Sequence, residues 1–410
     1  MRKIYLVFGA IVIFKQIFTF SIPIFSIPFL GRDVNTVMFY FFIGISLLIF
    51  LFDCFQRNRI HIRDFCLLCY IFTSILGSLL NWKNFTYFVS DACLFLMPIA
   101  VYIWVVHTEI TFEVFVKIFG IVSILAATVS VLVSIGILDV GIWAAEGDYV
   151  RAAGAINSTF GVGSIIIASV LIFNSNKNEH SINIFLLYSM LISGFIIVLL
   201  SFSRTRWILC ATLFVSIFLS TFKRNVNINK FGALRIICFI LVALFFVKFF
   251  SPEFFDKIFE QMSDRFEKVT IGDHSITYRG EEADLQMKLF WQNPFFGSGW
   301  GSLSSKGMYT HAIYPALLAQ SGIFALCYLI WYFSVLFSTI KFRKTNKDSP
   351  YIQISLLLQF ALFVLNLTNS GFIVSGGYIA LAMIFIVEKS LFSIEKQRRD
   401  MCEDRNTNFS

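Results

Sequence analysis

Charged residues are scarce in this 410-residue chain. It has 33 basic and 25 acidic residues, together 14% of the total, whereas about a quarter of a soluble domain is charged. This scarcity excludes an ordinary soluble domain. The charges are also crowded into a few stretches, and the apolar runs between them have about 20 residues, the length that an α-helix needs to cross the hydrocarbon of a bilayer.

The apolar runs are continuous and show no alternation of polar and apolar residues, which excludes the strands of a membrane barrel. We therefore predict an all-α polytopic membrane protein with about twelve spanning helices. The first run carries Lys15 and lacks a small-residue cleavage site, so it is expected to be a retained helix rather than a signal peptide. The runs are 4–24, 37–55, 64–80, 87–106, 114–136, 155–173, 183–202, 207–222, 232–250, 312–340, 352–370 and 374–392.

The basic residues predict the orientation. Twelve spans place both termini on one side, and a cytoplasmic N-terminus gives the cytoplasmic face seventeen Lys and Arg residues against five in the short external loops. The long loop 251–311 is then external, and both termini are cytoplasmic. The formal charge of +8 is mostly this orientation signal. No patch mixes basic and aromatic residues as a nucleic-acid site would, so no nucleic acid is expected as a partner.

No cysteine lies in a loop that is predicted to be external, so no structural disulfide is expected there. Cys66 and Cys69 form a single CxxC at the start of an apolar span, which is a weak signal for metal or redox chemistry. We predict no metal site and no cofactor. No internal repeat is visible, which weakens the case for the inverted repeats common in transporters.

The loop 251–311 is patterned. Ser251-Pro252-Glu253 is typical of a helix start, and apolar residues at helical spacing follow it to Val269, so an amphipathic helix is predicted there. A second helix is predicted from near Gly280 to Asn293-Pro294. Its apolar face is expected to comprise Ala283, Met287, Phe290 and Trp291. The glycine-rich stretch 297–301 after it predicts a tight loop.

His311 opens a run that Pro315 and Gly322 interrupt. We therefore predict a short re-entrant or surface-lying segment over 311–322, with the histidine at the mouth of the helix bundle and a spanning helix after Gly322. Irregular backbone at this depth is tolerated where it lines a polar cavity.

Four arginines lie on the predicted external face, where the excess of basic residues that marks a cytoplasmic face does not account for them. Arg204 and Arg206 occupy a very short link between two spans, Arg151 lies in the polar link 137–158, and Arg279 lies in the long loop. The plainer interpretation of the short link is a tight turn whose arginines reach water and headgroups. The functional interpretation is an anion site, because arginine binds phosphate through bidentate hydrogen bonds.

A ligand with a lipid tail and a phosphate or pyrophosphate head fits arginines near the membrane plane. If the reaction cleaves a sugar–phosphate bond, the same arginines stabilise the charge that grows on the leaving group. His311 is then a candidate general base, or else a histidine that merely caps a helix start. Glu281, Glu282 and Asp273 flank Arg279 as alternative bases or as a solvated loop face, and Asp91 is an ionisable residue within a span that either functions or pairs with a neighbour.

Several of these residues lie in motifs that resemble those of a known protein family. Arg151-Ala-Ala-Gly154 with Asn157, then Ser201 to Arg204, then the block from Arg279 through Asn293-Pro294 to His311 resemble the bacterial superfamily of O-antigen polymerases and O-antigen ligases. From His311 to Gly322 the spacing is that of the ligases, whereas Ala312 stands where ligases usually have Asn or Ser. The resemblance covers roughly residues 150–370, and of the two activities it favours the polymerase.

The resemblance implies a GT-C-like membrane glycosyltransferase of hexosyltransferase type, with one large periplasmic loop and metal-independent, inverting chemistry. Its substrates would be undecaprenyl-pyrophosphate-linked repeat units as donor and acceptor in lipopolysaccharide O-antigen synthesis. It implies that Arg204 and Arg279 hold the pyrophosphate, that His311 is the base or an orienting group, and that Arg151 contacts substrate. The predicted role of Arg206 does not come from the resemblance; it rests only on the argument that arginines near the membrane plane bind a phosphate group. A chain-length-regulating protein is an implied partner.

The expected organisation is spans one to nine over 1–250, the periplasmic loop over 251–311, spans ten to twelve over 312–392 and a cytoplasmic tail over 393–410, in the bacterial inner membrane. Two other functions stay open. An O-antigen ligase would transfer the glycan to lipid A–core. A lipid-linked oligosaccharide flippase would place ionisable residues near the midplane of the membrane, whereas here the polar residues gather at one face.

Overall fold

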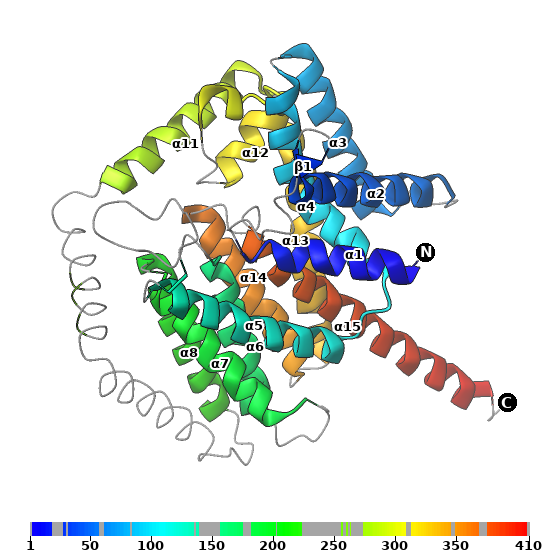
Figure 1. The fold of residues 1–410 in the computed structure, drawn as a ribbon. Helices are drawn as coiled ribbons and strands as arrows, with labels where there is room; N and C mark the ends of the chain where they lie inside the picture. Colours follow the sequence, from blue (N-terminus) through cyan, green and yellow to red (C-terminus); the bar gives the residue numbers. More distant parts are fainter. Residues whose placement is uncertain are drawn as a thin grey trace.

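The fold is a bundle of helices, seen in a computed structural model (Figure 1). A two-residue strand pair, β1 (Pro28–Phe29) with β2 (Arg32–Asp33), accompanies the helices. The residues described are 2–18, 28–29, 32–56, 61–82, 84–134, 137–138, 156–174, 182–201, 203–223, 256, 260, 263, 274–308, 313–345, 349–368 and 375–407.

Most of the helices follow the predicted runs closely, but the last one continues fifteen residues beyond its predicted end at 392, into the predicted tail. Before the long loop they are α1 (Arg2–Lys15), α2 (Val34–Gln56), α3 (Ile62–Leu80), α4 (Phe85–His107), α5 (Phe112–Ser134), α6 (Ser158–Phe173), α7 (Ile184–Leu199) and α8 (Arg204–Lys223). From the long loop onward they are α11 (His274–Gln292), η4 (Ser304–Lys306), α12 (Ile313–Ser321), η5 (Gly322–Phe324), α13 (Ala325–Thr345), α14 (Pro350–Thr368) and α15 (Ser375–Thr407).

Six helical stretches in the described part are long and apolar enough to cross a membrane, namely α2, α3, α4, α5, the stretch from α12 to α13, and α14. Shorter apolar helices are α6, α7 and the first part of α8. The prediction of an all-α polytopic membrane protein is confirmed. The predicted span 232–250 and the predicted helix 251–269 lie outside the described residues, apart from three isolated positions of the latter.

The first helix is shorter than predicted. The apolar run extends to residue 24, but α1 ends at Lys15, and a turn follows in which the N–H of Ile17 donates to the carbonyl of Phe14 at 3.2 Å. The carbonyl of Ile17 then accepts from the N–H of Asn157 at 2.9 Å. The chain therefore exchanges its helical hydrogen bonds for a pairing with the residues before α6, and hydropathy alone carries no information on such a pairing.

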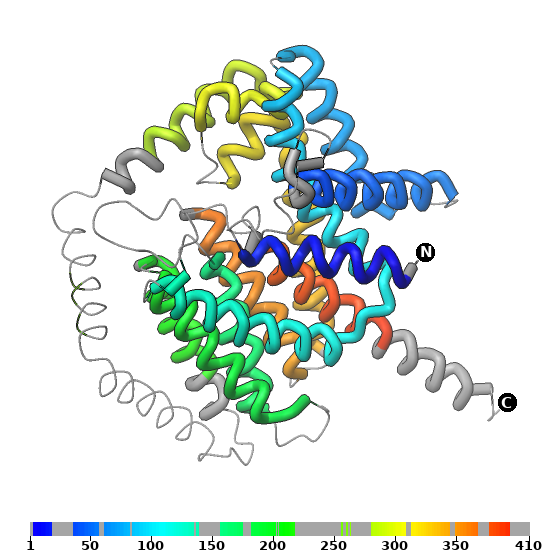
Figure 2. The backbone as a smooth tube through the Cα atoms, in the orientation of Figure 1, coloured from blue at the N-terminus to red at the C-terminus, as the bar shows by residue number. Residues whose placement is uncertain are grey.

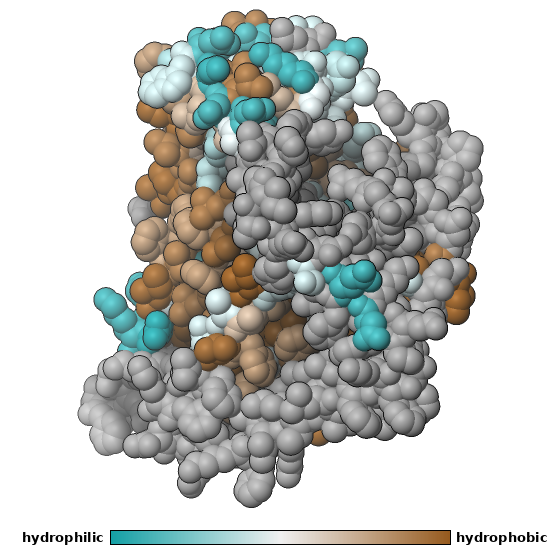
Figure 3. Space-filling model, turned by 90° about the vertical axis from the view of Figure 1, so that its left-hand side faces the viewer, coloured by the Kyte–Doolittle hydropathy of each residue, from teal (hydrophilic) through white to brown (hydrophobic). Residues whose placement is uncertain are grey.

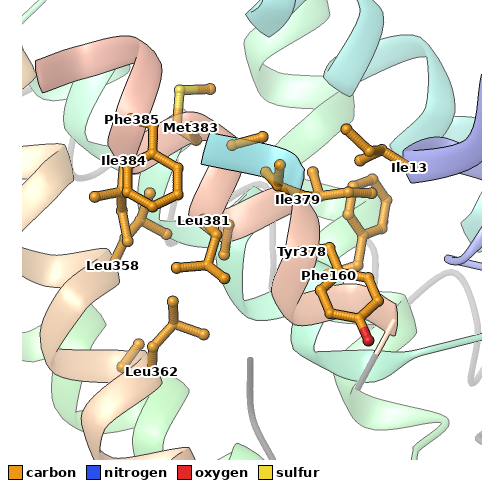
Figure 4. Packing of buried hydrophobic residues seen from close by; sticks show 14 of the residues in the cluster. Ile13, Phe160, Leu358, Leu362, Tyr378, Ile379, Leu381, Met383, Ile384 and Phe385 are labelled. Atoms are coloured by element: carbon orange, nitrogen blue, oxygen red, sulfur yellow. The ribbon is translucent and has the colours of Figure 1, made fainter. Parts of the chain in front are cut away.

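The centre of the bundle is the first half of α15. Tyr378, Leu381 and Phe385 are buried there, and Figure 4 shows this helix between residues of α1, α6 and α14, including Ile13 and Phe160. Since lipid is as apolar as leucine, these contacts stabilise the bundle through close packing rather than through removal from water.

The helices α6 and α7 approach each other closely at a pair of glycines. A Cβ atom on Gly161 would lie 2.9 Å from the carbonyl oxygen of Gly194, and the converse distance is the same. Small residues at a contact let helix backbones pack closely within membranes. A buried hydrogen bond between the hydroxyls of Ser123 and Ser164, 2.9 Å long, joins α5 to α6 beside this contact.

Charged residues are paired where α3 begins and α4 ends. Nη1 of Arg63 lies 3.1 Å from both carboxylate oxygens of Glu388 on α15, and its guanidinium lies over the ring of Tyr102, 4.5 Å from the centroid. The next residue, Lys389, donates to the carbonyls of Val105 and Thr108 at the end of α4, where the helix dipole favours a cation. These contacts fix α15 to α3 and α4.

Replacing Glu388 with glutamine is expected to destabilise the protein by about 2 kcal/mol, because it removes a charge-assisted hydrogen bond from a buried pair. Thermal unfolding of the purified protein in detergent measures this effect. The exposed Glu281 offers a control, since Glu281→Gln is expected to unfold like the wild type. Equal stability of both variants would show that the Arg63–Glu388 pair contributes nothing.

Candidate functional site

One end of the bundle carries an irregular polar segment, residues 293–308, which we call the glycine loop. It follows α11 and lies where α3 ends and α4 begins. Figures 1 and 2 show α11 and α12 beside α3 at this end, and Figure 3 shows hydrophilic side chains gathered at the same end, above a largely apolar face. The tight loop predicted from the sequence is confirmed by four glycines with positive φ: Gly297, Gly299, Gly301 and Gly307.

Asp91, near the start of α4, anchors the glycine loop. It is only 2% exposed. Its carboxylate accepts hydrogen bonds from the N–H of Gly301 at 2.8 Å and from the side-chain amide of Gln320 at 2.9 Å. The hydroxyl of Ser304 also donates to it, as does the Ser304 N–H at 3.5 Å. The sequence left two interpretations of Asp91, a function of its own or a pairing with neighbouring residues, and the structure supports the pairing. This one buried side chain joins α4, the glycine loop and α12.

The glycine loop also packs directly against α3 and α12. The N–H of Trp300 donates to the hydroxyl of Ser78 at 2.7 Å, and the N–H of Gly299 donates to the carbonyl of Gln320 at 2.9 Å. Trp300 itself is buried against Tyr70 of α3, with ring centroids 6.3 Å apart. The loop is thus held by backbone groups on both sides, as buried backbone polar groups require.

The helix α12 is the short segment predicted over 311–322. Gly322 has a φ of 60° and starts the turn of 3₁₀ helix between α12 and α13, which confirms the predicted break. The predicted break at Pro315 is wrong, because Pro315 lies in the first turn of α12. A proline is tolerated there, since the N–H that it lacks has no helical acceptor at that position.

The helix α12 crosses the end of the bundle from α14 to α3. The ring of Tyr314 in its first turn lies 6.0 Å from that of Phe363 on α14. At its other end the hydroxyl of Ser321 is hydrogen-bonded to that of Ser74 on α3, at 2.8 Å. The segment that begins after His311 is therefore fixed to two different spanning helices.

The helix α11 begins six positions before its predicted start, and its buried positions are not those of its apolar face. Trp291 is 70% exposed, whereas Glu282, Gln286 and Leu289 are buried. The side-chain amide of Gln286 donates to the carboxylate of Glu282 at 3.4 Å. Glu281 is exposed, as a solvated loop face would be.

The helices α11 and α12 pack against each other. Both end at the glycine loop, where the N–H of Ile323 donates to the carbonyl of Pro294 at 2.8 Å. Glu282 lies about 15 Å before the end of α11 at Gln292, and Ile313 lies about 12 Å before the end of α12 at Ser321, at 1.5 Å per residue. The turn of α11 around Glu282 and the first residues of α12 therefore lie at similar distances from the loop.

The predicted site residues are distributed as follows. Arg204 is the first residue of α8 and Arg279 lies in the second turn of α11, but their side chains are outside the described part. Arg206 is half-buried in the first turn of α8. The link after α7 is short, as predicted, but it ends before Arg204, so both arginines lie on α8 and not in the link. Arg151 and His311 lie outside the described residues.

The sequence alone does not indicate the partners of Asp91. Ser304 and Gln320 are unremarkable polar residues in their own segments, and they gain a role only where the fold brings them to α4. Two signals existed: an acidic residue within an apolar span, and a loop with glycine at every second position from 297 to 301. Neither signal indicates that the two belong together.

These features define a polytopic helical membrane protein with a polar loop and a short broken helix at one end of its bundle. Residues 188–330 match the Wzy_C family, described as O-antigen ligase. The matched part covers about a third of the chain and contains α8, α11, the glycine loop and α12. It includes the positions of Arg204, Arg206, Arg279 and His311, whereas Arg151 lies outside it.

The match supports the O-antigen polymerase and ligase superfamily, and with it a glycosyltransferase-like function in O-antigen processing. It does not separate polymerases from ligases. No curated protein matches the chain.

Proposed function

We propose that the protein is an O-antigen polymerase, a metal-independent glycosyltransferase that joins undecaprenyl-pyrophosphate-linked repeat units at the periplasmic face of the bacterial inner membrane. The observation that carries the proposal is the family match over residues 188–330, which contains the glycine loop and both helices that end at it. The distribution of Lys and Arg supports cytoplasmic termini and a periplasmic position for this end of the bundle.

In the proposed reaction, a hydroxyl of the acceptor repeat attacks the anomeric carbon of the donor glycan. The bond between that carbon and the phosphate oxygen breaks, and lipid pyrophosphate leaves with the electron pair. His311 takes the proton of the hydroxyl. Arg204 and Arg279 hold the pyrophosphate and stabilise its growing charge, while Arg206 and Arg151 are further contacts to pyrophosphate or glycan.

The anchored loop and α12 support these roles physically. A group that acts on a transferred proton has to be held within a fraction of an ångström. The chain enters α12 two residues after His311, and α12 is tied to α3, α14 and Asp91. The residue after the histidine is Ala312, where ligases usually have Asn or Ser, which favours the polymerase. A chain-length-regulating protein is the expected partner.

The test uses the purified protein in detergent with lipid-pyrophosphate-linked repeat units and no nucleotide. The wild type is expected to produce a ladder of glycans, and Arg279→Ala and His311→Ala are expected to produce none. The exposed Ser90 provides a control, since Ser90→Ala is expected to retain the ladder. Ladders of wild-type length in both site variants would remove the proposed site.

A ligase is the second candidate, because the matched family is described by that activity. In the same assay with lipid A–core added, a ligase would leave repeat units single and attach them to the core. A flippase would move labelled lipid across a proteoliposome membrane without any growth of glycan.

A further inference from the structure

Three acidic residues flank Arg279 in the sequence, and the structure separates them. Glu281 is exposed, Asp273 lies outside the described residues, and Glu282 is only 4% exposed. Burying a carboxylate costs several kcal/mol unless hydrogen bonds and a positive charge compensate it. A buried glutamate on a helix that also bears exposed acidic residues therefore calls for a specific compensating group.

The described surroundings of Glu282 are polar on its C-terminal side. Gln286, one turn later, is fully buried and donates from its side-chain amide to the Glu282 carboxylate at 3.4 Å. The carbonyl oxygen of the Gln286 side chain has no hydrogen-bond partner among the described residues. This pair lies on the buried face of α11, which becomes apolar only at Leu289, nearer the glycine loop.

The positive charge nearest along the helix is on the N-terminal side. Arg279 precedes Glu282 by three residues, a spacing that places the two positions next to each other on one helix surface. It is the only basic residue within a turn of Glu282 in either direction. The order along this face is thus Arg279, Glu282 and Gln286.

We propose that Glu282 is a positioning residue of the transfer site, which orients the guanidinium of Arg279 toward the pyrophosphate of the donor. Gln286 holds the carboxylate, the carboxylate accepts from one edge of the guanidinium, and the remaining N–H groups are left for phosphate oxygens. Such a fork has five donors in fixed geometry, so two partners can share it. This role rests on the proposed function and deepens it.

The test compares Glu282→Gln and Glu282→Asp with Asp284→Asn, a matched change at an exposed acid two residues away. Glu282→Gln is expected to lower kcat for glycan growth by about 10- to 100-fold, with KM for the lipid-linked donor changed by less than about threefold, because misplacing a charge-stabilising group acts mainly on the transition state. Glu282→Asp is expected to recover part of the loss, and Asp284→Asn to behave as wild type.

A double-mutant cycle identifies the path of the effect. If Glu282 acts through Arg279, then Glu282→Gln costs little further activity when Arg279→Lys is already present. Multiplied losses in the double variant, or a wild-type kcat for Glu282→Gln, would overturn the proposal. So would a loss that follows the amount of folded protein, measured by thermal unfolding, with kcat per folded molecule unchanged. If the wild type and Asp284→Asn make no glycan, the proposed polymerase activity itself fails, and this role fails with it.

Discussion

Replacing Asp91 with alanine is expected to destabilise the protein by roughly 3–5 kcal/mol and to release the glycine loop. The substitution leaves the N–H of Gly301, the hydroxyl of Ser304 and the amide of Gln320 without their common acceptor. Each buried donor that loses its partner costs about 1–3 kcal/mol. Unfolding in detergent measures the first effect, and hydrogen–deuterium exchange of a peptide covering 297–308 measures the second.

Two further variants sharpen this prediction. Asp91→Asn keeps the shape but turns an amide N–H₂ toward groups that are themselves donors, so an intermediate loss of about 2 kcal/mol is expected. Ser90→Ala, at the exposed neighbouring position, is expected to change neither stability nor exchange. If the loop exchanged at the wild-type rate in Asp91→Ala, the anchor would have to lie elsewhere.

Gly299→Ala is expected to separate the glycine loop from α3. Gly299 has a φ of 76°, and a Cβ atom there would overlap the backbone of Ser78. The substitution therefore combines left-handed strain with a clash that no side-chain rotation relieves. It also moves the N–H groups that donate to Ser78 and Gln320. A total loss of several kcal/mol and of glycan transfer is expected.

Gly307 supplies the matched control in the same loop. Its φ is 66°, but a Cβ atom there would meet nothing within 4 Å. Gly307→Ala thus has the left-handed strain alone, about 1–2 kcal/mol, and is expected to leave transfer intact. Thermal unfolding and the glycan ladder of the two variants are compared side by side. Equal losses in both would mean that the contact with α3 contributes nothing beyond backbone strain.

The helices could be predicted because their cause is local. A continuous apolar run of about 20 residues forms a helix in a membrane whatever its neighbours are, since hydrocarbon offers no partner for the backbone. The break at Gly322 was likewise a local feature, as was a short link between α7 and α8, although the start of α8 at Arg204 was placed too late. The end of α1 was not, because it depends on a pairing of Ile17 with Asn157, far along the chain.

The face of α11 shows a second limit. Apolar periodicity predicts the buried face of a helix in a soluble protein, where the exposed face is in water. At the edge of a membrane the exposed face can meet lipid, so an apolar stripe carries no unique direction. Trp291 is exposed although it is apolar, and Glu282 is buried although it has the same chemical character as Glu281.

The sequence by itself determined that this protein is a helical membrane protein, and it singled out four arginines and a histidine on the face predicted to be external, because hydropathy and charge are properties of each segment alone. Only the tertiary structure decided that Asp91 anchors the glycine loop, which is 210 residues away in the chain, and that Glu282 rather than Glu281 is buried. Both outcomes depend on which segments of the chain come into contact. That is set by the packing of α3, α4, α11 and α12 together and by no one of them separately.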